Sequence, residues 1–443
     1  MIIIKQCTAW LKKLDRNHQE IAIGVLTVGF FVLIGKFAGA AKEVAVAWRY
    51  GVGETVDVYL FVFNLVQWPI SIWAGVIGAV LVPFAIKLQH ENIDALPRFR
   101  SELLGATLFL GVVLGLLAWL FFPWLVKQPW LGFKIESSKL ALSMLNVLLW
   151  TIPFGFVFHL FSAWTMSSGR HLNTLLQGVP ALVILVAVLF SSGPEPLVYG
   201  TLIGFVLQVL FLYVPLRWRG EAELPVFQFR SKYWVMFFAG FGMMLVGQAL
   251  MSITSIVDQF FAVRLGEGAL SKLGYSNRIL ALILGLGTTA IGRAALPVLS
   301  KVHLESRSQV SRLVMGWAGL LLFVGLGVAL AGAMFSETIV ELLYQRGAFK
   351  VDDTQQVAEV LRYALVQVPF YFVSIVLMQA LLSRSYYTTV ALVSGIALMV
   401  KIILSWLLVS EFGINGLLLA TAAVYAVFVI FYSAVLVLDS NSK

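Results

Sequence analysis

The chain of 443 residues has one cysteine, few charged residues and none of the short motifs that mark common catalytic centres. The single cysteine, Cys7, excludes an internal disulfide and a thiolate metal cluster. The sequence contains no GxxxxGK[ST], HExxH, CxxC or GxSxG pattern. We therefore expect no enzyme activity, no cofactor and no bound metal.

Charge is scarce, since 12% of the residues are charged while 60% are hydrophobic, with 33 Phe and 13 Trp. Apolar runs such as 103–122 and 417–437 recur along the chain, and a helix of about 20 residues matches a hydrocarbon core of about 30 Å. These runs have no alternating polar face, which predicts an all-α integral membrane protein rather than a barrel. The net charge of +9 lies mostly in short loops, which favours a role in membrane orientation over nucleic-acid binding.

We predict twelve transmembrane helices, several of them long enough to require tilt or kinks. The predicted spans are 20–48, 56–87, 103–126, 138–168, 172–191, 196–216, 233–263, 271–301, 313–344, 355–383, 387–410 and 414–438. Pro69, Pro153 and Pro369 are expected kink points. Residues 1–19 lack the long apolar core of a cleavable signal and predict an amphipathic helix on the membrane surface.

The basic residues between these spans are distributed unequally. With the N-terminus inside, the cytoplasmic segments hold 17 Lys and Arg and the outer segments hold 8. Three of those 8 are lysines of the single loop 127–139. The excess predicts that both termini lie in the cytoplasm.

The short motif Arg-x-Gly-x-Gly occurs twice, in "WRYGVGE" (48–54) and in "VRLGEGA" (263–269). Its arginines, Arg49 and Arg264, are 215 positions apart. Three more pairs follow in the same order: "LVPFAIK" (81–87) with "ALPVLSK" (295–301), "IPFGFVFHLFSAWTMSSGR" (152–170) with "VPFYFVSIVLMQALLSR" (368–384), and "VYGTLIG" (198–204) with "INGLLLA" (414–420). Four ordered matches at nearly one offset indicate an internal repeat.

The repeat predicts two six-helix lobes, 1–220 and 221–443, joined by the polar segment 217–232. Six spans per lobe is an even number, so both lobes have the same orientation and form a parallel repeat. A central cavity between two such lobes, exposed alternately to either side, is a recurring plan of transporters. The alternative is an old duplication whose lobes only pack together.

Charged residues inside predicted spans are costly to insert, so each invites a functional interpretation. The candidates are Lys36, Lys42, Asp258, Arg278, Arg293, Arg362 and Lys401, with Glu43 and Asp57 near the outer rim. Most are cations, which favours an anionic cargo, and Lys and Arg are the usual partners of phosphate. We predict that Lys36 and Lys42 of one lobe and Arg278 of the other hold a diphosphate. For Lys42 the alternative is a local ion pair with Glu43.

Several stretches resemble the lipid II flippases of the MurJ (MviN) family, in the multidrug/oligosaccharidyl-lipid/polysaccharide exporter superfamily. They are "GKFAGAAKEVAVAWRYGVGETVDVYLFVFNL" (35–65), "VDQFFAVRLGEGALSKLGYSNRILALILG" (257–285), "LPVLSK" (296–301) and "ELLYQRGAF" (341–349). The resemblance implies a flippase, not an enzyme. Such a protein moves a polyprenyl-diphosphate-linked glycan, lipid II first, to the outer leaflet of a bacterial inner membrane by alternating access. Its partners would be membrane lipids and cell-wall or polysaccharide biosynthesis enzymes.

The resemblance also bears on single residues. Lys36 and Lys42 fall where the family carries basic residues in the first span, and Arg278 matches the arginine of the eighth span. Asp57 matches an acidic residue that opens the second span. With Glu43, Arg49 and Arg264, Asp57 is assigned to the cavity rim or gate.

Two departures leave the cargo open. The family's basic pair in the second span is absent from "NLVQWPISIWAG" (64–75), and the sequence predicts twelve spans where fourteen are common. The alternatives are a flippase for an O-antigen or exopolysaccharide precursor, a cation-coupled small-molecule exporter, and a scaffold that does not transport.

The resemblance finally assigns Asp258 to a position that contributes to a sodium site in some relatives. The eleventh span offers Lys401 where those relatives carry amide or acidic partners. We hypothesise that the Lys401 ammonium pairs with Asp258, which would make transport independent of sodium. The alternative is that Lys401 extends to the inner membrane face.

Overall fold

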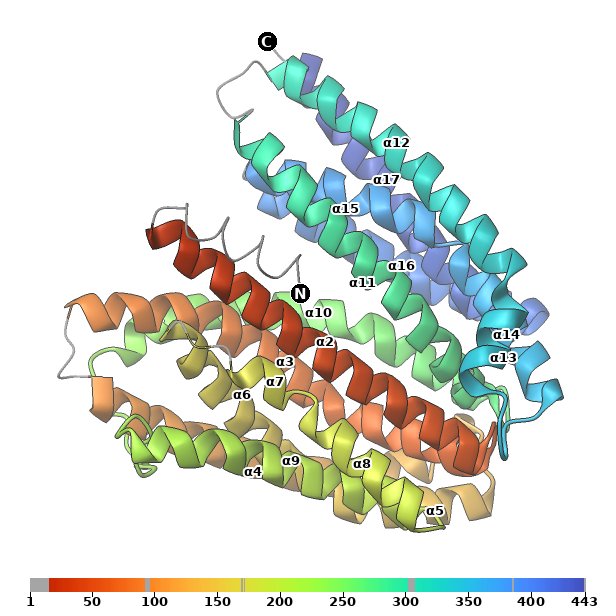
Figure 1. Ribbon diagram of the computed structural model, residues 1–443, viewed down its shortest axis with the longest axis horizontal. Helices are drawn as coiled ribbons and strands as arrows, with labels where there is room; N and C mark the ends of the chain where they lie inside the picture. Colours follow the sequence, from red (N-terminus) through yellow and green to blue (C-terminus); the bar gives the residue numbers. More distant parts are fainter. Residues whose placement is uncertain are drawn as a thin grey trace, which may run out of the picture. The chain divides into compact units, whose positions relative to one another are not determined.

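The computed structural model describes residues 16–91, 96–168, 170, 172–301, 307–384 and 386–441. These residues form helices and short connections, with no β-strand among them (Figure 1). Most of the predicted surface helix over 1–19 lies outside the described residues, and Arg16 already begins α2. The expected all-α class is confirmed.

The first half of the chain forms α2 (Arg16–Tyr50), α3 (Glu54–Glu91), α4 (Leu96–Val126), the 3-10 turn η2 (Pro129–Leu131), α5 (Ile135–Leu148), α6 (Thr151–Ser167), α7 (Leu172–Leu176), α8 (Val179–Phe190) and α9 (Glu195–Trp218). The second half forms α10 (Trp234–Val263), α11 (Ala269–Lys301), α12 (Arg307–Met334), α13 (Ser336–Tyr344), α14 (Val351–Leu365), α15 (Val368–Ser383), α16 (Tyr387–Phe412) and α17 (Ile414–Asn441). A helix or helix pair therefore lies at each of the twelve predicted spans.

Within the described residues, eight segments are long and apolar enough to cross a membrane, and nine if the pair α5–α6, bent by 42°, counts as one span. The other three predicted spans are α2, α10 and α11. Helices α2 and α11 contain Lys36, Lys42 and Arg278, the charges that the sequence analysis singled out. The count of twelve stays a prediction for these three helices.

The repeat is visible in how two broken spans are packed. Helices α5–α6 and α14–α15 each break near a proline, Pro153 in α6 and Pro369 in α15. A Cβ atom on Gly111 of α4 would lie 2.9 Å from Pro153 Cα, and one on Gly325 of α12 would lie 2.5 Å from Pro369 Cα. Glycine therefore allows the same close approach in both halves, at positions 214 apart in the chain.

Two ion pairs follow the same pattern. Arg170, just after α6, pairs with Glu221 after α9, with Nη2 2.6 Å from Oε1. Arg384, at the end of α15, pairs with Asp439 near the end of α17, with Nη1 2.5 Å from Oδ2. Each half thus ties the end of its broken span to the end of its last helix.

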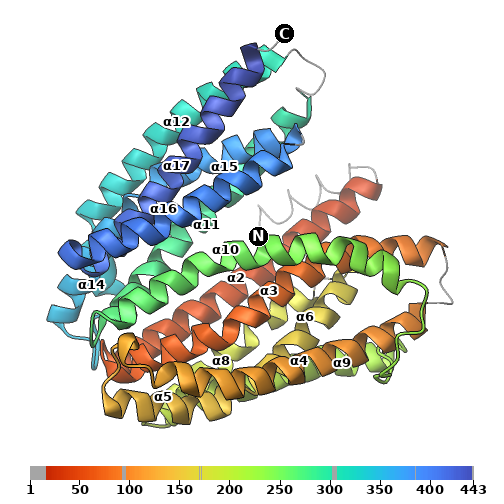
Figure 2. The same cartoon turned by 180° about the vertical axis from the view of Figure 1, so that it is seen from behind.

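The chain forms two compact units. Unit 1 contains Met1–Val46, Val66–Pro123 and Ser143–Leu245, and unit 2 contains Ala47–Leu65, Trp124–Leu142 and Val246–Lys443. In unit 1, α8 lies along α9, and in unit 2, α16 lies along α17 (Figures 1 and 2). The units are not the predicted lobes 1–220 and 221–443, because segments of the first half belong to unit 2. The predicted lobe boundary stays a prediction.

Candidate functional site

Lys36 lies on α2 with its side chain exposed within unit 1. One turn of this helix is packed closely, because a Cβ atom on Gly178 would lie 3.1 Å from Gly35 Cα. Gly178 precedes α8, so α2 and the start of α8 are in close contact at Gly35. Gly39 has no atom within 4 Å of its Cβ position and is not part of that contact. The packing fixes the backbone beside Lys36.

Lys42 lies farther along α2 and forms an ion pair with the adjacent Glu43, Nζ to Oε1 2.6 Å. Both side chains are largely buried, at 13% and 12% exposure. This is the local pair that the sequence offered as the alternative to diphosphate binding. An anion that binds Lys42 therefore has to compete with Glu43.

Arg278 lies on α11 in unit 2, and its side chain is exposed there. Lys36 and Lys42 belong to unit 1. Because these cations are carried by different units, their convergence on one diphosphate stays a prediction.

Asp57 stands in the first turn of α3 and holds the start of α11. Its Oδ2 accepts a hydrogen bond from Gly268 N at 2.5 Å, and its Oδ1 accepts one from Ser271 N at 2.6 Å. The first backbone N–H groups of a helix have no partner inside it and favour negative charge. The carboxylate of Asp57, which belongs to α3, gives these N–H groups of α11 both an acceptor and a negative charge. The Asp57 side chain is buried.

Further contacts in unit 2 join the connection between α2 and α3 to second-half segments. Ala348 N donates to Trp48 O at 2.8 Å, and Tyr275 Oη donates to Gly51 O at 3.0 Å. Gly51 has a φ of +62°, and a Cβ atom there would lie 2.6 Å from the Ala348 carbonyl oxygen. We call this set the latch: Trp48, Gly51, Asp57, Gly268, Ser271, Tyr275 and Ala348.

The other residues assigned to the gate lie close to the latch in sequence. The Arg49 guanidinium is 5.3 Å from the ring centre of Trp48. The Arg264 side chain is exposed, and its Cα lies 3.4 Å from the position of a Cβ atom on Gly132. Glu43 instead pairs with Lys42 in unit 1. The gating roles of Arg49, Arg264 and Glu43 stay predictions.

Lys401 of α16 and Asp258 of α10 come together in unit 2, with Nζ 2.6 Å from Oδ1. The Lys401 side chain is 0% exposed. Its ammonium also donates to Leu417 O at 2.9 Å and to Thr421 Oγ1 at 2.5 Å, both on α17. Three oxygen atoms therefore surround this buried cation. The hypothesised pair is present, and its role in ion coupling stays a prediction.

Sequence reasoning missed the acidic partners of Arg170 and Arg384. The Arg170 guanidinium donates hydrogen bonds to the Glu221 carboxylate, and these bonds raise the pKa of the guanidinium above its ordinary value. The sequence did contain a signal for these pairs, because each half has an acidic residue just beyond its last span. Glu221 follows Arg170 by 51 positions, and Asp439 follows Arg384 by 55. The partners of Asp57 are main-chain groups and had no such signal.

The fold first defines a class of protein. The described helices superimpose on a solved structure of a lipid II flippase MurJ in an inward closed conformation, with a TM-score of 0.78 and 19% identity, covering 92% of this chain and 86% of that one. They also match an inward-facing multidrug resistance MATE family transporter of the MOP superfamily, with a TM-score of 0.72 and 16% identity, covering 92% and 96%. The chain has the same fold as these two solved transporters.

The sequence comparisons then give the family. The family model for lipid II flippase MurJ matches residues 46–437. Probable lipid II flippases MurJ of Rhizobium tropici and Vibrio cholerae are both 26% identical to the chain over 90% of its length, and the matches cover 77% and 79% of those proteins. The chain belongs to the MurJ lipid II flippase family, as its motifs predicted.

Proposed function

We propose that this protein moves a polyprenyl-diphosphate-linked glycan across the membrane, and that lipid II is its cargo. The observation that carries the proposal is the family match, which extends over residues 46–437. Lys36, Lys42 and Arg278 supply cations suited to a diphosphate. Lysine is a compact charge without the planar fork of arginine, so two of the three contacts would be looser than arginine contacts.

In this proposal, binding and gating are linked through exchange of partners. Lys42 releases Glu43 when a phosphate arrives, because the anion replaces the carboxylate beside the ammonium. The latch holds one end of the helices closed, and it opens when Asp57 gives up the N–H groups of Gly268 and Ser271. Alternation between the two states would carry the head group past the apolar interior.

The proposed location is the inner membrane of a bacterium, with both termini in the cytoplasm. The excess of basic residues in the segments assigned to that side supports this orientation. Enzymes of cell-wall or polysaccharide biosynthesis would then supply the cargo on the cytoplasmic side and use it on the other.

The test is rescue of bacteria depleted of their own lipid II flippase. The wild-type chain should restore growth, while Lys36→Ala and Arg278→Ala should fail although both insert in the membrane at normal levels. Lys127→Ala, which removes an exposed lysine outside the proposed site, is the matched control and should rescue. If the inserted wild-type protein does not rescue, lipid II is the wrong cargo, and labelled O-antigen or exopolysaccharide precursors become the next substrates.

We further propose that transport is independent of sodium, since the Lys401 ammonium already neutralises Asp258. Reconstituted protein should move its cargo equally well in sodium and potassium buffers of the same ionic strength. Faster transport by the intact protein in sodium than in potassium would contradict this part of the proposal.

A further inference from the structure

Residues 217–232 contain the last two residues of α9 and most of its connection to α10; we call this segment the strap, and it is held against other parts of unit 1 at several points. Val226 N donates to Ser101 O at 3.0 Å, and Ser231 N donates to Glu102 Oε2 at 3.0 Å. Both partners belong to the start of α4. The strap is therefore a docked element and not a loose tether.

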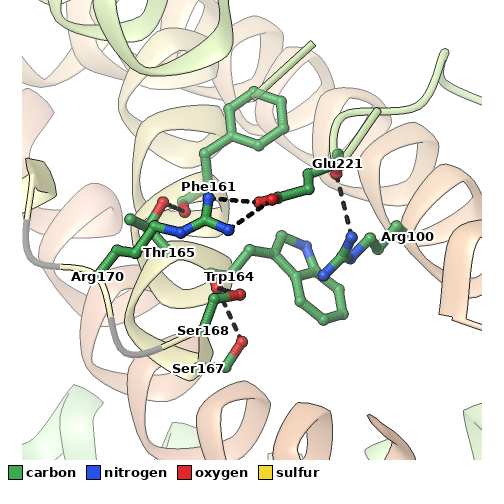
Figure 3. A network of polar contacts seen from close by, with 8 residues as sticks. All are labelled: Arg100, Phe161, Trp164, Thr165, Ser167, Ser168, Arg170 and Glu221. Carbon is green, nitrogen blue, oxygen red and sulfur yellow. Dashed lines mark hydrogen bonds and ion pairs between the residues drawn. The ribbon is translucent and has the colours of Figure 1, made fainter. Parts of the chain in front are cut away.

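Glu221 anchors the strap at its other end (Figure 3). Its carboxylate accepts hydrogen bonds from Arg170 Nη1 at 2.8 Å and Nη2 at 2.6 Å, and its backbone oxygen accepts one from Arg100 Nη1 at 3.4 Å. The Arg100 guanidinium also lies 4.9 Å from the ring centre of Trp164. Both of these cations therefore already have partners within unit 1.

The outward side of the strap carries a different set of side chains. Its exposed cations are Arg217, Arg219, Arg230 and Lys232. Between and beside them stand exposed aromatic rings, with Trp218 83% exposed and Phe227 66% exposed. The strap has only two acids, and one of them, Glu221, is held by Arg170. The outward side is thus both positively charged and aromatic.

The strap lies where helices of unit 1 end. Helix α9 ends at Trp218, α10 begins at Trp234 and α4 begins at Leu96. Helix ends of a membrane protein mark the boundary between hydrocarbon and water, where aromatic side chains concentrate. Basic side chains at that boundary attract anionic lipids. Exposed rings suit the apolar side of this boundary, and exposed cations suit the layer of lipid phosphates. A soluble acidic partner would account for the cations but not for the rings.

We propose that the strap is a binding surface for the head groups of anionic phospholipids. Arg219, Arg230 and Lys232 contact the lipid phosphates, while Trp218 and Phe227 enter the level of the glycerol and upper acyl chains. Docking on α4 and on Arg170, which follows α6, holds the strap in place before a lipid arrives, which reduces the entropy lost on binding. This surface is separate from the proposed diphosphate site and does not depend on which glycan is carried.

The test measures lipid binding by the full chain in detergent, with native mass spectrometry counting bound phosphatidylglycerol or phosphatidylcholine at equal concentrations. The strap variant combines Arg219→Gln, Arg230→Gln and Lys232→Gln. It keeps Arg217, whose guanidinium also donates to Ala222 O. The matched control removes three exposed lysines of another segment: Lys127→Gln, Lys134→Gln and Lys139→Gln.

We expect the wild-type protein to hold more phosphatidylglycerol than phosphatidylcholine. The strap variant should bind phosphatidylglycerol about tenfold more weakly or worse, and the control should stay within about twofold. Equal binding of the two lipids, or equal losses in both variants, would overturn the proposal. Displacement of phosphatidylglycerol by the same concentration of inorganic phosphate would identify a soluble anion site instead. If the strap variant does not fold, Arg219→Gln and Lys232→Gln alone should each weaken binding about threefold.

Discussion

Lys401 shows how this protein keeps a charge in its apolar interior. An isolated ammonium would be very costly to bury, but here it forms an ion pair with a carboxylate and donates hydrogen bonds to a carbonyl oxygen and a hydroxyl. Asp258 shares in the compensation, because its own charge is neutralised by the same contact. Three helices, α10, α16 and α17, are joined at this point.

Removal of one member of the pair should therefore cost more than removal of both. We expect Lys401→Met to destabilise the protein by about 3–5 kcal/mol, because Asp258 would be left buried without its cation. The double variant Lys401→Met, Asp258→Asn should recover most of that loss. Thermal unfolding in detergent measures the difference. If the single and double variants lose the same stability, the pair contributes nothing beyond the packing of Lys401.

At the scale of elements, the two broken spans explain why glycine stands at Gly111 and Gly325. Each break lies near a proline, and the neighbouring helix packs closely against the Cα atom of that proline. The distance from the Gly325 Cβ position to Pro369 Cα leaves no room for a methyl group. The same arrangement at Gly111 indicates that it was present before the two halves diverged.

Gly325→Ala should consequently destabilise the protein by about 1–3 kcal/mol, as expected for overpacking against backbone. The matched control is Gly327→Ala in the same helix, where no atom lies within 4 Å of the Cβ position. That change should be neutral or stabilise by about 0.5–1 kcal/mol, since alanine favours helix over glycine. Unfolding temperatures of the two variants give the comparison. Equal effects would show that the close approach to Pro369 is not needed.

At the scale of the whole molecule, the sequence predicted what depends on apolar length and on repetition. A helix lies at each of the twelve apolar segments, and the breaks near Pro153 and Pro369 follow from proline geometry. It could not predict the partners of Asp57, because the N–H groups of Gly268 and Ser271 have no residue-specific signal and lie 211 and 214 positions away. The sequence also could not decide whether Lys42 pairs with Glu43 or with a phosphate, because that depends on distances in the folded protein.

The latch ties the first half of the chain to the second inside unit 2, and the opening that we propose would break it. Asp57 forms its strongest part, since hydrogen bonds to a charged acceptor contribute about 1.5–3 kcal/mol each. We expect Asp57→Ala to favour the open state by on the order of 3 kcal/mol, about a hundredfold in the equilibrium. A protein without this carboxylate should therefore spend far more time with the latch open.

Thiol labelling measures this opening in a Cys7→Ser background with Val58→Cys, since Val58 is buried beside Asp57. The rate of labelling by a water-soluble maleimide should rise strongly when Asp57→Ala is added. The control is Asp353→Asn, which removes a carboxylate that caps α14 from within that helix by accepting from Lys350 N at 2.8 Å. It should leave the rate unchanged, because it joins no second segment. Equal rates in all three proteins would mean that the latch opens without breaking the Asp57 contacts, and gating would have to be assigned elsewhere in the chain.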